Sequence, residues 1–234
     1  MSRSRFALSV KRAVDIIGAT IGVVVLAPVF AITSLAILAT AGRPIFFRQQ
    51  RSGLHGRPFA IAKFRTMRLT RPGEIFYATD DQRITPLGRF LRSTSIDELP
   101  ELWNVLRGDM SLVGPRPLLV EFLSQYTPEE QRRHDMPAGI TGWAAVNGRH
   151  VLKFHDRLKL DVQYVDEWSL WLDLKIMAVT VVQVLRRTGV TETQDIKEMG
   201  FPLAHIRSSA KAGEDNEDAV GGNASGTPRG TGEP

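Results

Sequence analysis

The sequence predicts an α+β fold that is mainly helical, with a re-entrant membrane helix, a small cytosolic domain containing a short β-hairpin or sheet, and interfacial amphipathic helices. Three observations support this prediction. Residues 16–42 carry no charged side chain and are rich in Val, Ile, Leu and Ala. Two short apolar runs enclose a turn at Gly53 and Gly56. Five later segments have the composition or apolar spacing of helices: residues 86–92, 97–107, 129–133, 151–168 and 169–185.

Composition limits the classes of protein to which the chain can belong. Its 234 residues suffice for one domain with a hydrophobic core and an appendage at each end. A net charge of +5 and a pI near 9.8 predict an anionic partner, such as acidic lipid head groups, a nucleotide or nucleic acid. The absence of cysteine excludes disulfides, cysteine-ligated zinc, iron–sulfur clusters and thiol catalysis, and fits a cytosol-facing protein. The five histidines lack metal-binding spacing.

The uncharged segment at residues 16–42 is long enough to cross a bilayer, which takes about 20 residues. It is too long for a signal peptide, whose apolar core spans about 7–15 residues. Basic residues flank the segment on both sides, and the positive-inside rule therefore places both ends on the cytoplasmic face. One straight crossing cannot satisfy both ends. The flanking residues are Arg3, Arg5, Lys11 and Arg12 before the segment, and Arg43, Arg48, Arg51 and Arg57 after it.

Pro28 lies near the middle of this segment, where a bend would resolve the conflict. Proline removes a backbone hydrogen bond and clashes with the preceding turn, so it kinks or breaks a helix. We therefore predict a re-entrant hairpin that enters one leaflet and returns. An ordinary spanning helix with a tolerated proline remains the alternative.

The β component is expected directly after the membrane segment. Residues 44–47 and 59–62 are predicted to form short strands on either side of the glycine turn. The Gly-x-x-Gly of this turn is too weak to indicate a nucleotide fingerprint, and the sequence has no Walker A motif. Residues 70–81 are expected to form a loop, and residues 86–92 a short helix.

The helix predicted over residues 97–107 begins with two acids, and its start can be placed in two ways. A start at Ser95 would make a capping box with Glu98, but Pro100 would then lose a helical hydrogen bond. A start at Asp97 puts Pro100 in the first turn, where its missing N–H has no partner anyway, and is preferred. In either case both acids sit at the positive end of the helix dipole. The predicted apolar face consists of Leu99, Leu102, Trp103 and Leu106.

Prolines and glycines punctuate the chain beyond this helix. Gly108 is predicted to end it. Residues 114–117, Gly-Pro-Arg-Pro, should be extended and stiff, because each proline restricts itself and the residue before it, so that Arg116 points in a fixed direction. Residues 129–133 are predicted to be helical, and residues 137–148 to form a glycine-rich loop or hairpin.

Two longer helices are expected towards the end of the domain. Residues 151–168 fit an amphipathic helix. Residues 169–185 carry two charges and are flanked by Trp168 and Trp171, which suits a helix in the membrane interface or, equally, a buried core helix. From residue 208 the composition is too poor in apolar residues to fold. The predicted division is residues 1–42 for the basic segment and membrane helix, 43–190 for the cytosolic domain with interfacial helices, and 191–234 for a C-terminal extension that is disordered from about residue 208.

The acids and the basic residues together suggest phosphate chemistry. A nucleoside diphosphate sugar carries a pyrophosphate, which needs cations as its charge redistributes, and arginine matches phosphate oxygens with a planar fork. Asp97 could attack phosphorus as a nucleophile, and Mg²⁺ would be held by one or two carboxylates and the substrate phosphates. Alternatively, Asp97 and Glu98 only cap a helix and the arginines bind lipid head groups. The candidate phosphate-binding residues are Lys63, Arg65, Arg92 and Arg116.

From about residue 11 to residue 189, ordered motifs resemble the bacterial sugar transferases that are monotopic phosphoglycosyl transferases, which include undecaprenyl-phosphate galactose and glucose phosphotransferases. The motifs are Lys11-Arg12-x-x-Asp15, Phe47-Arg48-Gln49-x-Arg51-x-Gly53-x-x-Gly56, Lys63-Phe64-Arg65-x-Met67, Asp81-x-Arg83-Ile84-Thr85-x-x-Gly88, Asp97-Glu98-Leu99-Pro100, Asn104-Val105-Leu106-x-Gly108-Asp109-Met110-Ser111, Gly114-Pro115-Arg116-Pro117, Gly139-Ile140-Thr141-Gly142-Trp143 and Val146-Asn147-Gly148-Arg149.

The resemblance implies a re-entrant membrane helix, interfacial helices and an active site on the cytoplasmic face of the bacterial inner membrane. It implies that Asp97 attacks the β-phosphate of a UDP-sugar, releases UMP, and passes the phosphosugar to polyprenyl phosphate. Glu98 would assist Mg²⁺ binding or proton handling, so that Asp97 and Glu98 are also the expected metal ligands. The membrane-helix residues that match or define the motif are Lys11, Arg12, Asp15 and Pro28.

Three positions depart from the family pattern. Ala27 stands where a serine often precedes the mid-helix proline, Ala145 replaces a usual glutamine, and Ala138 interrupts a common Pro-Gly-Ile-Thr-Gly. The last two weaken any inference about the sugar and leave the chemistry intact. Without the multi-span or sugar-modifying domains of larger relatives, the chain is expected to be a minimal catalytic unit.

A non-catalytic membrane adaptor that binds anionic lipid or polymer is the alternative function. Nucleic acid is not an expected partner, because carboxylates interrupt the basic residues and aromatic stacking motifs are absent. The sugar, the glycan pathway (capsule, exopolysaccharide, O-antigen or glycoprotein), homodimer formation and the role of the tail stay open.

Overall fold

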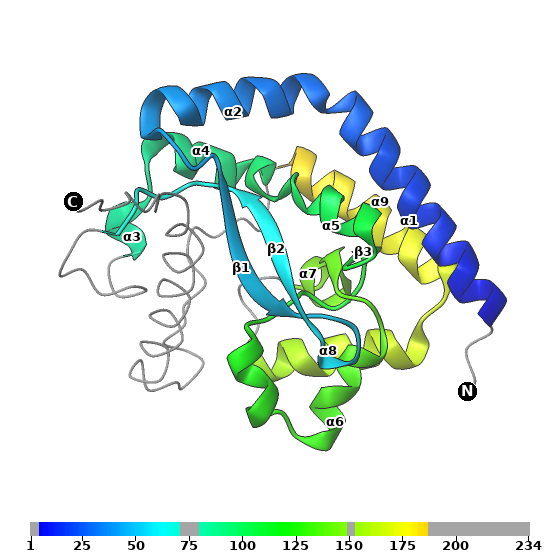
Figure 1. Cartoon of the computed structure of the whole chain (residues 1–234). Helices are drawn as coiled ribbons and strands as arrows, with labels where there is room; N and C mark the ends of the chain where they lie inside the picture. Colours follow the sequence, from blue (N-terminus) through cyan, green and yellow to red (C-terminus); the bar gives the residue numbers. More distant parts are fainter. Residues whose placement is uncertain (1–4, 71–79, 149–152, 187–234) are drawn as a thin grey trace, which may run out of the picture. The chain divides into compact units, whose positions relative to one another are not determined.

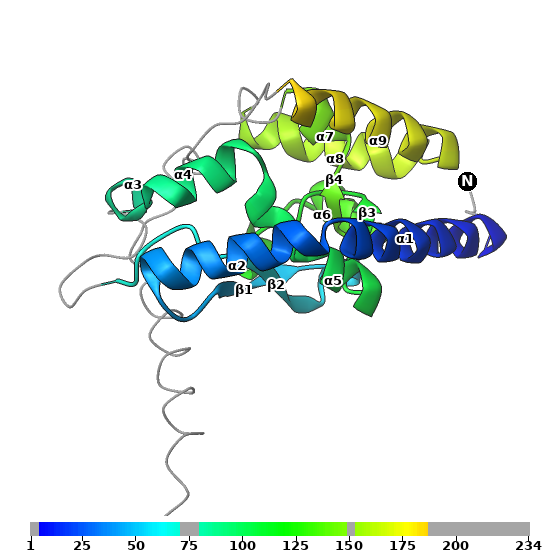
Figure 2. The same ribbon diagram turned by 90° about the horizontal axis from the view of Figure 1, so that it is seen from above.

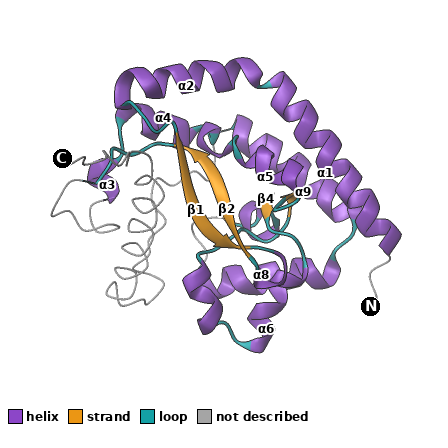
Figure 3. Cartoon of the chain, viewed as in Figure 1, coloured by secondary structure: helices purple, strands orange, loops and turns teal. Residues whose placement is uncertain are grey.

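The computed structural model describes residues 5–70, 80–148 and 153–186 (Figure 1). Most of the described elements are helices, with two small two-stranded sheets among them (Figure 3). The prediction of a mainly helical α+β fold is therefore confirmed.

Two helices, α1 (Arg5–Val25) and α2 (Ala27–Ala41), meet at a bend of 60° and form an arch along one side of the described chain (Figure 1). Pro28 lies in the first turn of α2, where its missing N–H costs no helical hydrogen bond, and Leu26 separates the two helices. The predicted break at Pro28 is confirmed. Among the described residues no single helix has the length and apolarity to cross a bilayer, but the bent pair together has them.

The predicted hairpin is also confirmed, with strands longer than expected. Strand β1 (Phe46–Ser52) pairs antiparallel with β2 (Pro58–Phe64), and Phe46 lies opposite Phe64 at the open end. A 3₁₀ turn, Leu54–Gly56, joins them, and Gly56 has a φ of +71°, which glycine adopts without strain.

The predicted helix at residues 86–92 is observed as α4 (Pro86–Ser93). Thr85 caps it by accepting a hydrogen bond on its hydroxyl from the Gly88 N–H at 2.9 Å. A β-carbon at Gly88 would lie 1.9 Å from the Thr66 carbonyl oxygen, so glycine lets α4 approach the end of the hairpin closely. Figure 2 shows α4 near α2 and α5 close to α1.

The prediction of one continuous helix over residues 97–107 is wrong. Residues Ile96–Glu98 form a 3₁₀ turn, η2, and the helix α5 (Glu101–Arg107) begins only after Pro100, its N-cap. The two acids therefore lie in a turn ahead of the helix instead of in its first turn. Ser95 makes no capping hydrogen bond. The predicted stop is confirmed, because Gly108 has a φ of +91°.

The second sheet corrects the prediction of a loop or hairpin at residues 137–148. Within that range, strand β4 (Gly139–Thr141) pairs in parallel with the distant strand β3 (Ser111–Val113), and a short helix, α7 (Trp143–Val146), follows where a hairpin would need a second strand. The remaining elements are α3 (Asp80–Arg83), η3 (Val120–Gln125), α6 (Pro128–Gln131), η4 (Arg132–Asp135), α8 (Phe154–Glu167) and α9 (Leu170–Leu185). They include helices at or near the positions predicted for residues 129–133, 151–168 and 169–185.

Buried apolar residues form three groups that join the arch to the rest of the described chain. One joins α1, β2 and α5, the second surrounds β3, α8 and α9, and the third joins α2 to β2 and α4. Trp103, predicted on the apolar face of its helix, is instead 59% exposed. The loop predicted at residues 70–81 falls mostly outside the described residues, as does the tail expected to be disordered from residue 208. The boundaries predicted at residues 42 and 190 stay predictions.

Candidate active site

The two acids predicted as functional lie in the short turn between α4 and α5. Ser95 adopts a left-handed conformation with a φ of +56°, and the chain turns there after α4. The Glu98 N–H then donates to the Ser95 carbonyl at 3.3 Å, and the Leu99 N–H to the Ile96 carbonyl at 3.2 Å. This 3₁₀ turn brings Asp97 and Glu98 towards β2, the strand that carries Lys63.

Glu98 lies between two cations. Its Oε1 accepts hydrogen bonds from Lys63 Nζ at 2.7 Å and from Arg116 Nη2. Burial alone would raise the pKa of Glu98, but the charges and hydrogen bonds of Arg116 and Lys63 hold it well below its usual range. Glu98 is therefore ionised throughout the neutral pH range.

Both cations around Glu98 stay charged. The neighbouring Glu98 carboxylate raises the pKa of Arg116 above its ordinary value. Burial disfavours the ammonium of Lys63, but Glu98 and Glu101 more than offset this and raise its pKa. Strand β2 and the loop that carries Arg116 thus hold two positive charges beside the acids.

Asp97 differs from Glu98 in having no hydrogen bond to its carboxylate among the described residues, although it is only 9% exposed. Burial and the nearby charge of Glu98 raise the pKa of Asp97 to about 6, against the opposing charges of Lys63, Arg92 and Arg116. A carboxylate that is ionised at neutral pH, poorly solvated and close to cations has the properties of a nucleophile for an anionic substrate.

Glu101, which was not predicted as a site residue, lies in the same cluster. It is 2% exposed, and its Oε1 is 3.1 Å from Lys63 Nζ, an ion-pair distance at which the angles fall short of a hydrogen bond. Burial raises the pKa of Glu101 to about 7. Its spacing of three residues from Glu98 and four from Asp97 was the available sequence signal. We call Asp97, Glu98 and Glu101 the carboxylate cluster.

The structure brings three of the four predicted phosphate-binding residues to this cluster and not the fourth. Lys63 and Arg116 contact Glu98, and the charge of Arg92 lowers the pKa of Asp97 while its Nε donates to Thr66. Arg65 is 6% exposed, and its guanidinium donates to three carbonyls at the end of α2, at 2.5, 2.7 and 3.0 Å. Arg65 therefore caps α2.

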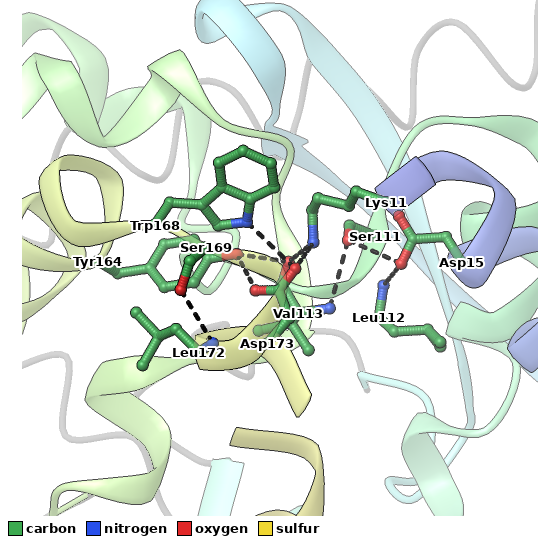
Figure 4. Close-up of polar contacts among 10 residues, drawn as sticks. All are labelled: Lys11, Asp15, Ser111, Leu112, Val113, Tyr164, Trp168, Ser169, Leu172 and Asp173. Carbon is green, nitrogen blue, oxygen red and sulfur yellow. Dashed lines mark hydrogen bonds and ion pairs between the residues drawn. The ribbon is translucent and has the colours of Figure 1, made fainter. Parts of the chain in front are cut away.

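The motif residues of α1 attach that helix to the domain. Lys11 Nζ donates to Asp173 Oδ2 and to the Val113 carbonyl, both at 2.8 Å (Figure 4). The second oxygen of Asp173 accepts from the Tyr164 hydroxyl at 2.7 Å, and Trp168 Nε1 donates to Oδ2 at 3.1 Å. We call these five residues the anchor network, which joins α1 to β3, α8 and α9.

Two further residues of the same motif have structural contacts. Asp15 Oδ1 accepts hydrogen bonds from the Ser111 hydroxyl and the Leu112 N–H, each at 2.9 Å (Figure 4). Arg12 donates to two carbonyls in the last turn of α5, at 2.6 and 2.9 Å. These contacts fix α1 against β3 and α5, so that the arch and the carboxylate cluster share one packed unit.

Comparison with known proteins identifies the class to which this fold and cluster belong. The sequence model of the family described as bacterial sugar transferase matches residues 6–187. This match covers the arch, both sheets and the whole carboxylate cluster. The chain belongs to the bacterial sugar transferase family.

Curated relatives agree with this assignment. The uncharacterized sugar transferase EpsL of Bacillus subtilis is 48% identical over 176 residues, which are 72% of this chain and 87% of EpsL. A UDP-glucose:undecaprenyl-phosphate glucose-1-phosphate transferase of Caulobacter vibrioides is 43% identical over 185 residues, or 75% of this chain and 69% of the relative. A protein of the same name in Escherichia coli is 41% identical over 181 residues, or 73% of this chain but only 39% of its own length.

Proposed function

We propose that the chain transfers a sugar 1-phosphate from a UDP-sugar to polyprenyl phosphate, in the manner that the names of its relatives describe, and so initiates a lipid-linked glycan. The observation that carries this proposal is the Asp97 carboxylate, which is buried, lacks a hydrogen bond within the described chain, and lies near the charges of Lys63, Arg92 and Arg116. A helix cap would use its carboxylate on backbone N–H groups. Asp97 instead faces cations that a pyrophosphate would need.

In the first step, a carboxylate oxygen of Asp97 forms a bond to the β-phosphorus of the UDP-sugar. The bond from that phosphorus to the bridging oxygen breaks, and UMP leaves with the bridging oxygen. Arg116, Lys63 and Arg92 neutralise the charge that develops on the phosphate oxygens. The product on the enzyme is an aspartyl-phosphosugar.

In the second step, a phosphate oxygen of polyprenyl phosphate attacks the same phosphorus and breaks its bond to Asp97. This gives a polyprenyl-diphosphate sugar and regenerates the carboxylate, so one anhydride replaces another. No proton has to be transferred to the leaving groups at neutral pH. The depressed pKa of Glu98 therefore favours a role in holding cations over proton handling.

Magnesium is proposed to bind at Asp97 and Glu98. Both hydrogen bonds described for Glu98 end on Oε1, so its second oxygen and the Asp97 carboxylate are the donors that fit a hard cation. Within the described ranges no three His, Cys, Asp or Glu side chains are placed to hold one metal ion together, so substrate phosphates would complete the coordination. When bound, the ion would neutralise part of the pyrophosphate charge.

The arch is proposed to be the re-entrant membrane helix of the bacterial inner membrane, with the carboxylate cluster facing the cytoplasm. The support is the 60° bend, the combined apolar length of α1 and α2, and the many exposed apolar side chains on both helices. Trp171 on α9 is 75% exposed and suits the interface. The exposed apolar residues of the arch include Ile17, Ile21, Val24, Val25, Ile32 and Leu35.

The experiment that tests this function measures UMP release from a panel of UDP-sugars by membrane-reconstituted protein, with undecaprenyl phosphate and Mg²⁺. Wild type is expected to release UMP from at least one sugar. Asp97→Asn should lose at least about a thousandfold in turnover, because an amide cannot form the acyl phosphate. Asp156→Asn, at an exposed acid of α8, is the matched control and should retain full activity.

Omitting the polyprenyl phosphate tests the covalent intermediate. Wild type should then release a burst of about one UMP per active site and gain the mass of a phosphosugar, since the second step is blocked. If folded wild type released no UMP from any sugar in the panel, the transferase proposal would be wrong. Binding of anionic vesicles that Asp97→Asn preserves would then support the adaptor alternative.

A further inference from the structure

A second buried ion pair holds the loop that carries Arg116, and the proposed reaction does not use it directly. Arg133 and Asp161 are each 1% exposed. Nε and Nη2 of Arg133 donate to Asp161 Oδ2 at 3.0 and 2.6 Å. The same Nη2 donates to the backbone carbonyl of Arg116 at 2.6 Å. One guanidinium thus connects η4, α8 and the peptide from which the Arg116 side chain extends.

Stability alone is a weak reason for such a pair. Transferring two charges out of water costs about as much free energy as their attraction returns. A protein in which apolar residues of similar size replace a buried ion pair is often equally stable. The guanidinium of Arg133 has a specific advantage here, because its planar fork serves a carboxylate and a carbonyl together. A lysine at position 133 has no such fixed geometry.

The backbone around Arg116 depends on this contact. Earlier in the loop, the Gly114 N–H donates to the Thr141 carbonyl at 2.8 Å and the Gly139 N–H donates to the Pro115 carbonyl at 3.0 Å. The next anchored carbonyl is that of Leu118. Between them the Arg116 carbonyl is held by the Arg133 side chain, in a stretch where prolines 115 and 117 have no N–H to donate.

We propose that Arg133, fixed by Asp161, is a positioning residue that directs the Arg116 side chain onto Glu98 and the substrate phosphates. The inference rests on the proposed function, in which Arg116 neutralises charge. The Arg116 side chain is long and 31% exposed, so its placement at Glu98 depends on where its peptide points. A misplacement of about 1 Å at such a group can cost about 100-fold in rate.

The test compares kcat and KM for UMP release in wild type and Arg133→Lys, which keeps a cation beside Asp161. We expect kcat/KM to fall about 10-fold to 100-fold. Asp166→Asn is the matched control and should change kcat/KM less than about twofold, because its exposed partner Arg132 links the same two elements, η4 and α8, without touching Arg116. If Arg133→Lys does not fold, the pair Arg133→Met with Asp161→Leu replaces it.

A double-mutant cycle separates positioning from general weakening. In an Arg116→Ala background, Arg133→Lys should cause little further loss, because it acts through a side chain that is already gone. An equal loss in both backgrounds, or no loss in the wild-type background, would overturn the proposal.

Hydrogen exchange at the amides of residues 114–119 gives a readout that needs no turnover. The amides that report are those of Gly114, Arg116, Leu118 and Leu119, and their exchange should be faster in Arg133→Lys and unchanged in Asp166→Asn. Unchanged exchange in Arg133→Lys would contradict the proposed anchoring. If wild type releases no UMP while exchange responds as expected, the transferase function fails and the anchoring of the Arg116 loop stands.

Discussion

Lys11 is buried and Lys63 is partly buried, and both lysines face carboxylates, but their surroundings differ. Lys11 faces one carboxylate, Asp173, whose two oxygens accept from Lys11, Tyr164 and Trp168. The second hydrogen bond of the Lys11 ammonium goes to the backbone carbonyl of Val113. Each polar group of this anchor network that the structure describes has a partner, and the charges match one to one.

Lys63 lies beside the carboxylate cluster, where one lysine faces several carboxylates and some polar groups have no hydrogen-bond partner. It contacts Glu98 and Glu101, while Asp97 lies close enough for its charge to act on the lysine. Within the described residues, Asp97 and the Oε1 of Glu101 have no hydrogen bond. Satisfied polar groups stabilise a fold, whereas unsatisfied ones cost stability and remain available for a ligand. This difference separates the structural ion pair from the candidate active site.

The largest effect is expected from breaking the anchor network. Asp173→Asn leaves the Lys11 ammonium buried without a countercharge and presents an amide to its donors. We expect a loss of about 3–5 kcal/mol in the free energy of unfolding, measured by denaturant titration in detergent. The paired variant Lys11→Met with Asp173→Leu should recover most of this loss, because no charge is then left unpaired and Tyr164 can donate to the Val113 carbonyl. A full loss in the paired variant would contradict this view.

Removing a carboxylate from the carboxylate cluster should instead increase the free energy of unfolding. The folded-state pKa of Glu101, about 7, lies above its ordinary value of 4.5, so the ionised form is disfavoured in the folded state. Its contribution to stability is present below pH 4.5 and is lost as the pH rises towards 7. Glu101→Gln should therefore be more stable than wild type at pH 8, by an amount on the order of 1 kcal/mol, and similar to it at pH 4.5.

Denaturant unfolding of wild type and Glu101→Gln at pH 8 and about pH 4.5 measures the sign of this stability change. Glu129→Gln, at an exposed acid of α6, is the control and should show no such pH-dependent gain. A Glu101→Gln variant that is less stable at pH 8 would mean that Glu101 is a satisfied partner of Lys63, like Asp173 for Lys11.

Much of the fold could be predicted from local signals. The break at Pro28, the short helix that begins at Pro86 and the stop at Gly108 each depend on one residue and its immediate neighbours. The β3–β4 pairing could not be read in this way, because it joins three-residue strands whose partners, such as Ser111 and Gly139, are distant in the chain. The preferred helix start put Pro100 in the first turn, whereas in the structure Pro100 is the N-cap of α5, so the helix begins later than predicted.

The candidate site was predictable only in part, because local motifs indicate its residues but do not indicate contacts between distant residues. Motif spacing brought out Asp97, Glu98, Lys63 and Arg116, which the structure places together. Arg65 was assigned to phosphate, but its contacts are carbonyls at the end of α2 more than twenty residues earlier, which no local pattern indicates. The contact of Arg133 with Asp161 is likewise non-local.

The smallest expected effect is a shift in the pH dependence of the reaction. If Asp97 is the nucleophile, only its ionised form reacts, so kcat/KM should fall about tenfold for each pH unit below its pKa of about 6. The charge of Arg92 lowers that pKa, so Arg92→Gln should move the acid limb to higher pH. Arg132→Gln, which removes an exposed arginine of η4, should leave the limb in place. An acid limb that stays near pH 6 in Arg92→Gln would mean that a group other than Asp97 controls it. That result would contradict the assignment of Asp97 as the nucleophile.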